Sequence, residues 1–143
     1  MTTIRNLEAK DAPAVAWLIP QLTKNIAAPE KLITRIEVLA LADNCQYLVA
    51  ESDGVVVGFG GLAWYPIPSK GLIGWVEELV VDEKHRGQGV AKTLLEELLE
   101  IASQKELNTV KLTSVNSSTD KLYEQFGFVK KDHQYFAKKM ELM

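Results

Sequence analysis

Residues 77–91 read EELVVDEKHRGQGVA and pass from an apolar strand pattern, through a short polar turn, into the start of a helix. That helix is amphipathic, with apolar residues recurring at three and four positions until about Lys105. A helix N-terminus presents unpaired backbone N–H groups and the positive end of the helix dipole. Gly87 and Gly89 let an anion approach this backbone closely, so the expected ligand is a phosphate or pyrophosphate.

The loop differs from two common nucleotide-binding motifs. No Lys-Ser or Lys-Thr follows the second glycine as in G-x-x-x-x-G-K-[ST], and Lys92 occupies the third glycine position of G-x-G-x-x-G. The glycines taken alone are equally compatible with a strand–helix connection that binds nothing.

The first part of the chain is predicted to contain one strand and two helices. Residues 3–7 form a short candidate edge strand. Asp11, an acidic cap shortly before a proline, indicates the start of a helix over residues 14–25, which Pro20 kinks or shortens. Residues 29–40 form a second helix with one apolar face.

Two β runs, residues 46–51 and 55–64, are joined by an Asp53-Gly54 pair that favours a hairpin, and a third run covers 72–81. These runs predict an antiparallel meander in front of the glycine loop.

Behind the long helix, residues 109–115 form a strand of β-branched residues. Ser117 or Ser118 caps a short helix that Gly127 ends, and the tail is prone to form β-structure around residues 134–136. Together with the meander, this order predicts a mixed sheet with helices on its faces.

Length and composition exclude several classes of protein. A chain of 143 residues fits one domain, and a net charge of −3 argues against duplex nucleic acid as the main partner. The single cysteine, Cys45, cannot form an internal disulfide or anchor a multi-cysteine zinc site, so we expect no metal and a reducing, cytoplasmic setting. The sequence shows neither a signal-peptide pattern nor an apolar run of membrane-spanning length, so no membrane partner is expected.

Two motifs resemble those of the GNAT superfamily of N-acetyltransferases. Arg86-x-x-Gly89-x-Ala91 resembles the family's R/Q-x-x-G-x-G/A loop, and residues 116–128 resemble its N-x-x-A-x-x-L-Y-E-x-x-G-F stretch, with Thr119 in place of the common alanine. The resemblance implies an α/β (α+β) fold in a single domain over residues 1–143. Its sheet is mixed and mostly antiparallel, with six to seven strands, helices on both faces and a V-shaped opening between strands 4 and 5.

In that family the loop binds the pyrophosphate of acetyl-CoA, and the pantetheine arm lies in the opening. By resemblance, the main chain of Leu79 and Val81 contacts pantetheine, and a backbone N–H near Leu79 or Val80 stabilises the oxyanion. Asn116 contacts the cofactor arm or caps the next helix. The residues implied in cofactor binding are Leu79, Val80, Val81, Arg86, Gly87, Gln88, Gly89, Val90, Ala91, Lys92, Asn116 and Tyr123.

The catalytic candidates are two carboxylates and a tyrosine. Glu77 and Glu78 are adjacent in an apolar strand, where alternation places them on opposite faces. Burial of one would raise its pKa toward that of a useful base, and family analogy favours Glu77. The alternative is that both are solvated or pair with lysines. Tyr123 is the general acid by analogy, or else a packing tyrosine.

The leading hypothesis is therefore an acetyl-CoA-dependent N-acetyltransferase that acts on a primary amine by direct attack in a ternary complex. A non-catalytic acyl-CoA-binding or regulatory module of the same fold and a generic nucleotide-binding domain are the alternatives. The acceptor, a small molecule or a protein amine, is expected to contact residues 22–34 and 64–74. Trp64, Tyr65 and Trp75 either line that pocket or pack in the core. The acidic balance favours a cationic acceptor, and a homodimer is compatible with the sequence.

Overall fold

The computed structural model describes residues 1–24, 26–114 and 117–141, and its contacts divide the chain into two compact units, Met1–Thr113 and Ser114–Met143. The first unit contains the sheet and the long helices, and the second contains a short helix and the C-terminal tail.

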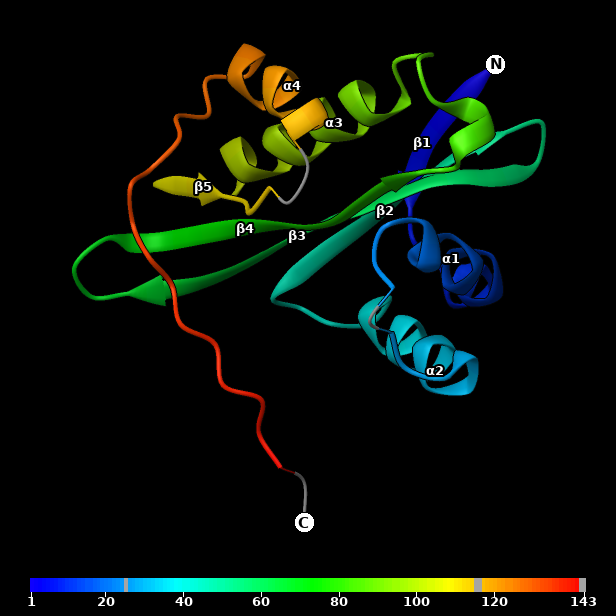
Figure 1. Ribbon diagram of the computed structural model, residues 1–143, viewed down its shortest axis with the longest axis horizontal. Coiled ribbons are helices and arrows are strands. Elements are labelled where there is room, and N and C mark those ends of the chain that lie inside the picture. Colours follow the sequence, from blue (N-terminus) through cyan, green and yellow to red (C-terminus); the bar gives the residue numbers. More distant parts are fainter. Residues whose placement is uncertain (25, 115–116, 142–143) are drawn as a thin grey trace. The chain divides into compact units, whose positions relative to one another are not determined.

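The sheet of the first unit has the strand order β1-β2-β3-β4-β5 (Figure 1). The strands β1 to β4 pair antiparallel, whereas β5 runs parallel to β4. The predicted mixed, mostly antiparallel sheet and the edge position of the first strand are thus confirmed. The strands are β1 (Thr2–Asn6), β2 (Cys45–Ser52), β3 (Val55–Ile67), β4 (Gly71–Val81) and β5 (Thr109–Lys111).

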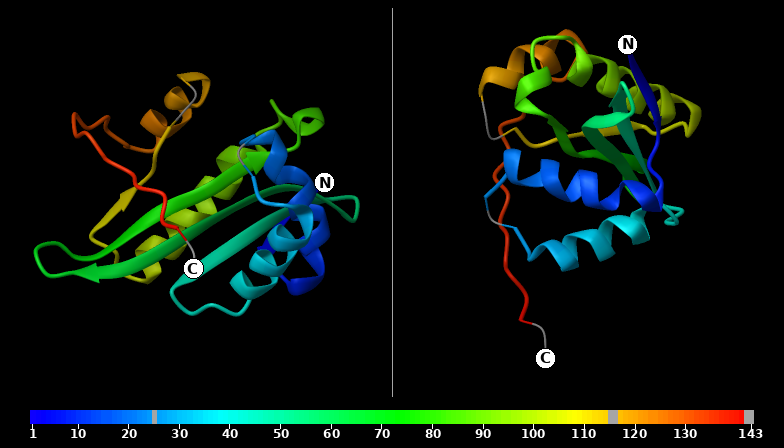
Figure 2. Two further views of the ribbon diagram at one scale, coloured as in Figure 1. Left: turned by 60° about the horizontal axis from the view of Figure 1, so that its bottom comes forward. Right: turned by 90° about the vertical axis from the view of Figure 1, so that its right-hand side faces the viewer.

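Helices cover both faces of this sheet, as Figures 1 and 2 show. One face carries α1 (Ala12–Leu18) and α2 (Pro29–Leu39), and the other carries α3 (Val90–Gln104). Pro20 lies in the 3₁₀ turn η2 (Ile19–Gln21), which ends the first helix earlier than the predicted residue 25. Two further 3₁₀ turns are η1 (Ala9–Asp11) and η3 (Glu83–His85).

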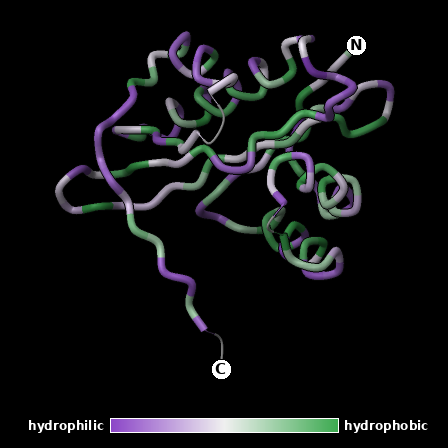
Figure 3. Tube along the Cα trace, in the orientation of Figure 1, coloured by the Kyte–Doolittle hydropathy of each residue, from purple (hydrophilic) through white to green (hydrophobic). Residues whose placement is uncertain are grey.

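Two apolar clusters hold these layers together. Phe59 and Val80 pack with Val15 and Leu18 of α1 in one cluster, while the buried Leu94, Leu95 and Leu98 lie along α3. In Figure 3 hydrophobic residues concentrate along the strands that cross between the helical layers. Gly58 permits the close approach of α3, because a Cβ there would lie 3.1 Å from side-chain atoms of Leu94 and Val90.

The predicted hairpin between β2 and β3 is confirmed, since Asp53 and Gly54 both have positive φ, at 50° and 79°. This is the combination that a tight two-residue hairpin turn requires. Asp11 occupies the N-cap position of α1, as predicted, but its side chain does not cap the helix. Its carboxylate makes no cap hydrogen bond to α1 and instead accepts from the Glu8 N–H at 2.9 Å and from Arg5. Closing the η1 turn and pairing with Arg5 occupy three of the roughly four acceptor sites of this carboxylate.

The second unit contains η4 (Ser117–Thr119) and α4 (Asp120–Gln125). Gly127 ends this helix as predicted: its φ is 87°, and the following Phe128 N–H donates to the Tyr123 carbonyl.

The predicted strand count is wrong for the part of the chain that the structure describes, where five strands replace the expected six to seven. Residues 129–141, the described part of the tail, contain no strand, and Tyr135 and Phe136 are 80% and 92% exposed. The predicted strand 109–115 is also shorter, because it ends at Lys111. A β-prone composition forms a strand only where a neighbouring backbone supplies the ladder. No helix among the described residues is long and apolar enough to cross a membrane.

Candidate functional site

Strand β4 loses its β5 partner partway along its length. The ladder between them consists of three residue pairs and ends at Trp75 and Lys111, whereas β4 continues to Val81. Backbone groups on the β5 side of β4 beyond Trp75 are therefore left without a ladder partner among the described strands. The resemblance implied an opening at this place, between the fourth and fifth strands.

The pairing of β4 with β3 identifies which residues face this opening. The Asp82 N–H donates to the Val57 carbonyl of β3 at 2.8 Å, so Asp82 and Val80 direct their backbone groups toward β3. Leu79 and Val81, by alternation, direct theirs toward the opening. The Val80 side chain is 4% exposed and packs in the apolar core.

One acceptor at this edge is already occupied. The Arg86 Nε–H donates to the Val81 carbonyl at 3.0 Å, which holds the guanidinium against the end of β4. Val81 therefore offers a ligand mainly its N–H, while Leu79 offers both its N–H and its carbonyl.

The connection from β4 to α3, residues 82–89, ends in two glycines with left-handed backbone. Gly87 has φ of 78° and Gly89 has φ of 82°, a region that other residues enter only with strain. A Cβ on either residue would have no described atom within 4 Å. The space above the turn is therefore open, and the backbone itself forms its floor.

The first turn of α3 is available to an anion. Gly89 is the N-cap, and no side chain among the described residues caps the helix or places a carboxylate in its first turn. The N–H groups at the helix start therefore keep their hydrogen-bonding capacity and the positive end of the dipole. Gln88 and Lys92 are exposed beside them, Ala91 is half-buried, and the buried Val90 anchors the turn to the sheet. This cradle fits a pyrophosphate.

The predicted placement of Glu77 and Glu78 on opposite faces relied on strict alternation, which β4 does not keep at this point. Both are exposed, and Glu78 has φ of 55°. Two residues of β4, Glu78 and Leu79, oppose the single Gly60 of β3, which is a β-bulge. The extra residue breaks the strict alternation on which the prediction relied.

The two carboxylates are nonetheless partly shielded from water, and this raises the pKa of both. Desolvation raises the pKa of Glu77, and the neighbouring charge of Glu78 raises it further. Desolvation also raises the pKa of Glu78. A carboxylate with a raised pKa is a stronger proton acceptor than an ordinary one.

Tyr47 lies near these carboxylates in the sheet, although the sequence predicted it only to be part of a strand. In the register of the sheet, Tyr47 pairs with Gly61, and Gly61 pairs with Glu77. A Cβ on Gly61 would overlap the Tyr47 ring, so the glycine lets that ring lie across β3. Its ring stacks on Phe59 with centroids 5.2 Å apart. Burial raises the pKa of Tyr47, and the nearby charges of Cys45, Glu77 and Glu78 add to this.

Tyr123 lies in α4 of the second unit, where its ring packs edge-on against Phe128 with centroids 6.1 Å apart. Partial burial raises the pKa of Tyr123, against a hydrogen bond with Thr119 that lowers it, so the hydroxyl stays protonated at neutral pH. Asn116 lies outside the described residues.

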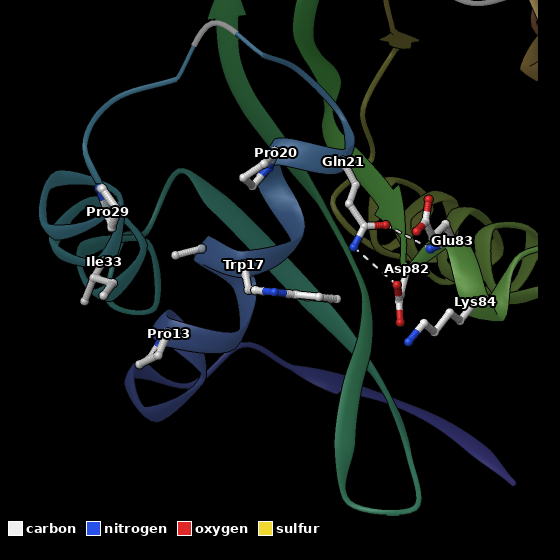
Figure 4. Close-up of a pocket in the computed structure, with 10 residues that line it drawn as sticks. Pro13, Trp17, Pro20, Gln21, Pro29, Ile33, Asp82, Glu83 and Lys84 are labelled. Atoms are coloured by element: carbon white, nitrogen blue, oxygen red, sulfur yellow. Dashed lines mark hydrogen bonds between the residues drawn. The ribbon is translucent and has the colours of Figure 1, made fainter.

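A groove of about 710 Å³ lies between the α1–α2 layer and the start of the β4–α3 connection (Figure 4). Its apolar wall includes the indole of Trp17, which is 62% exposed. Its polar wall is formed by Gln21 of η2 and the segment 82–84. No motif predicted Gln21. The full lining is Pro13, Ala16, Trp17, Pro20, Gln21, Pro29, Ile33, Asp82, Glu83 and Lys84.

The three aromatic residues expected to line the acceptor pocket or pack in the core do not all lie together. Trp75 donates a hydrogen bond from Nε1 to the Tyr65 hydroxyl at 3.1 Å, whereas Trp64 contacts Lys105 at the end of α3. In the register of β3 and β4, Trp75 pairs with Ala63, the neighbour of Trp64. Because side chains alternate along a strand, the two tryptophans lie on opposite faces of the sheet. Among the described residues, no group of three or more His, Cys, Asp or Glu side chains could hold a metal ion.

A model of the acetyltransferase (GNAT) family matches residues 3–128 of the chain. A glucosamine 6-phosphate N-acetyltransferase of Trypanosoma brucei brucei is 30% identical over 134 residues, which cover 87% of each of the two chains.

Solved structures agree with this match. The crystal structure of an acetyltransferase from Trypanosoma brucei superposes with a TM-score of 0.82 at 26% identity, covering 97% of this chain and 100% of the other. A predicted acetyltransferase from Clostridium acetobutylicum, solved with acetyl-CoA, has a TM-score of 0.82 at 17% identity and 96% coverage of both chains. At that lower identity the likeness shows the fold alone.

Proposed function

Because the chain belongs to the acetyltransferase (GNAT) family, we propose that it transfers an acetyl group from acetyl-CoA to a primary amine by direct attack in a ternary complex. The observation that carries this proposal is the uncapped start of α3, which lies directly after the open edge of β4. One segment of the chain thereby offers an anion cradle and a row of unpaired strand groups to the same extended ligand.

The cradle would hold the pyrophosphate through backbone N–H groups of residues 87–91, with Gln88 and Lys92 flanking it and Arg86 fixing the end of β4. The open edge would hold the pantetheine amides through Leu79 and Val81, since an arm lying along a strand can pair as a short parallel partner. Val80 would contribute the rigid packing that holds this edge in place.

Charge that develops on the acetyl oxygen needs a donor at the same edge. The Leu79 N–H faces the opening whereas that of Val80 faces β3, so we assign Leu79 as this donor. The bulge at Glu78 re-aims the backbone next to Leu79, which is a common use of bulges near active sites.

The amine arrives mostly as an ammonium ion and must lose protons to become a nucleophile. Glu77 and Glu78 attract the cation, and the one nearer the amine accepts its proton directly or through water. The ring of Tyr47 lies over Gly61, which pairs with Glu77, and its hydroxyl would orient the amine or that water. We assign Glu77 as the base because it pairs across the sheet with Gly61, under the tyrosine.

Tyr123 of the second unit is proposed to protonate the departing thiolate, for which a protonated hydroxyl is required. Asn116 is proposed to bind the cofactor arm, and residues 1–143 are proposed to act as one domain. The free thiol of Cys45 suits a reducing, cytoplasmic setting.

The acceptor is proposed to be a cationic primary amine, because the carboxylate pair gives its subsite a negative charge. An amino sugar is the first candidate, since the relative that is 30% identical acetylates glucosamine 6-phosphate by its name. Polyamines, aminoglycosides, amino acids and peptide amines complete the panel.

The test measures release of the CoA thiol from acetyl-CoA across this panel. Turnover with at least one amine is expected. Tight CoA binding without turnover on any amine would instead support a non-catalytic acyl-CoA-binding module.

A glycine pair tests the cradle itself. Gly89→Glu places a carboxylate against the pyrophosphate and should lower CoA affinity at least a hundredfold, about 2.7 kcal/mol. Gly54→Glu is the matched control, because Gly54 has φ of 79° and equally open surroundings in the β2–β3 turn. Equal CoA affinity of the two variants, measured by calorimetry, would contradict the cradle.

A further inference from the structure

Gln21 connects the α1–α2 layer to the β4–α3 connection. Its side-chain Nε2 donates to Asp82 Oδ1 at 3.2 Å, and its Oε1 accepts from the Glu83 N–H at 2.8 Å (Figure 4). Both ends of one amide group are thus used on two consecutive residues. The partners are 61 and 62 positions away in sequence, so these bonds are tertiary contacts between separate elements.

Asp82 is the centre of this arrangement. It is 8% exposed, and its second carboxylate oxygen lies 3.3 Å from His85 Nδ1. Its backbone N–H is bonded to Val57 of β3, and its carbonyl accepts from the His85 N–H at 2.8 Å. Although burial acts to raise it, hydrogen bonds from Gln21 and His85 hold the pKa of Asp82 below its usual range. The carboxylate therefore stays ionised and needs donors.

The position of the glycines at the end of the β4–α3 connection depends on how residues 82 and 83, at its start, are held. Glu83, bonded to Gln21, begins η3, which leads through Arg86 to the glycines. Those glycines have left-handed backbone, and apart from chain neighbours no described atom lies within 4 Å of the position a Cβ would take, so nothing described packs on their open side. Val90 holds the far end of the turn in the core, and Gln21 holds the start of the connection. A shift at residues 82 and 83 would carry the N–H groups of residues 87–91 with it.

We propose that Gln21 is a positioning residue for acetyl-CoA binding: it fixes the first turn of the β4–α3 connection and thereby aims the backbone N–H groups that receive the pyrophosphate. This inference rests on the function proposed above. Gln21 touches none of the reacting atoms and acts through Asp82 and Glu83.

The groove gives this bond network a second consequence. Gln21, Asp82 and Glu83 form part of its polar wall, next to the exposed indole of Trp17. A ligand in the groove would contact the same side chains that hold the connection.

The experiment separates binding of the nucleotide end of the donor from binding of its pantetheine arm. Calorimetry gives the affinities of CoA and of pantetheine, which lacks the pyrophosphate and the 3′-phosphoadenosine, and the ratio of the two reports the contribution of the nucleotide end, which includes the cradle. In Gln21→Ala the CoA affinity should fall about tenfold while the pantetheine affinity is unchanged, so the ratio falls about tenfold. A substitution that only destabilises the fold would lower the Tm but would leave the ratio of CoA affinity to pantetheine affinity unchanged.

A second substitution adds a pH readout. Gln21→Glu places a carboxylate against Asp82 and should lower the ratio further at pH 8 than at pH 5.5, because protonation of the new carboxyl restores a donor. Gln46→Ala is the control, since Gln46 makes a side-chain hydrogen bond to Asn6 Oδ1 at 2.9 Å but lies away from the connection.

Two failures are distinguishable. A wild-type protein that binds CoA no better than pantetheine would overturn the cradle and with it the proposed function. A wild-type protein with a high ratio that Gln21→Ala and Gln21→Glu both retain would overturn only the positioning role.

Discussion

Glu78 occupies a backbone conformation that its side chain does not favour. Its φ of 55° places it in the left-handed region, which costs a residue with a Cβ about 1–2 kcal/mol relative to the right-handed one. The strain coincides with the bulge that re-aims β4 beside the proposed oxyanion donor. Such strain is commonly kept where a site requires the geometry.

Two substitutions at this position measure the strain. Glu78→Ala and Glu78→Gly both remove the carboxylate, but only glycine relieves the left-handed backbone. The glycine variant is expected to be more stable than the alanine variant by about 1 kcal/mol in urea unfolding. Equal stability of the two would show that the bulge holds no strain at this residue.

The titration of Glu77 predicts the pH dependence of turnover. A base must be deprotonated, so kcat/KM should fall as the pH drops through the pKa of the base. Because burial and the charge of Glu78 raise the pKa of Glu77, this fall should begin at a higher pH than for an ordinary glutamate. Glu77→Gln should remove this acid limb and lower kcat about a hundredfold or more.

Glu78→Gln is the matched variant for that assignment. It removes the neighbouring charge, so the pKa of Glu77 and the acid limb should move to lower pH while turnover largely remains. The reverse result, with Glu78→Gln losing turnover and Glu77→Gln shifting the limb, would assign Glu78 as the base.

Single residues also show where sequence reasoning stops. The glycine loop and both glutamates were visible because their residue types carry the chemistry. The bulge in β4 could not be predicted, because glutamate is not a residue type that favours positive φ. Nothing else in the sequence of β4 indicates that the strand contains an extra residue. Gln21 and Tyr47 were missed for another reason: their importance comes from partners about 60 and 30 positions away, Asp82 and Glu77, which only the fold brings near.

At the scale of elements, the short turn η1 links β1, β2 and α1 through charge. Arg5 of β1 donates to both oxygens of Asp11 at 2.8 Å and to Glu51 of β2 at 3.1 Å. Asp11 is 4% exposed. The hydrogen bonds from Arg5 lower the pKa of its carboxyl, burial acts to raise that pKa, and the Glu8 N–H lowers it again. The net result is a pKa below the usual range. The pair fixes the entry to α1, whose Trp17 borders the groove.

Asp11→Asn is expected to lower the free energy of unfolding at pH 7 by about 3 kcal/mol, because it leaves Arg5 partly buried with weaker partners. A carboxyl whose pKa is lowered in the folded state stabilises the fold at pH values above its ordinary pKa, near 4. This stabilisation is lost as the pH falls below that value and the carboxyl becomes protonated. The gap between wild type and variant in urea unfolding should therefore narrow at pH 3. Glu8→Gln, at an exposed partner of Arg5, should change stability by less than about 1 kcal/mol.

Elements were predicted well where the pattern is local and poorly where it depends on a partner. The spacing of apolar residues in α3 and the Asp53-Gly54 turn located their elements closely. The tail was expected to add strands from its β-prone residues, yet a strand exists only against another backbone, and Tyr135 and Phe136 show none. Asp11 looked like a helix cap because the sequence does not reveal that Arg5 lies opposite it.

At the scale of the whole molecule, binding of the donor should appear as stability. A ligand that binds only the folded state at 100 times its Kd adds about 2.7 kcal/mol to the free energy of unfolding. For a chain of this length that corresponds to a rise in Tm of about 8 °C. Acetyl-CoA should produce this shift in a thermal melt, pantetheine a smaller one, and NAD none. A shift with NAD and none with acetyl-CoA would identify a generic nucleotide-binding domain instead.

The unpaired edge of β4 also exposes the protein to self-association. A strand with unsatisfied N–H and C=O groups is a template for pairing with a strand of another molecule, and proteins usually cover or close such edges. In the proposed function the donor occupies this edge, so another strand could not close it. The ligand would then act as the missing neighbour, so that the protein without acetyl-CoA should aggregate faster on heating or at high concentration than the protein saturated with it.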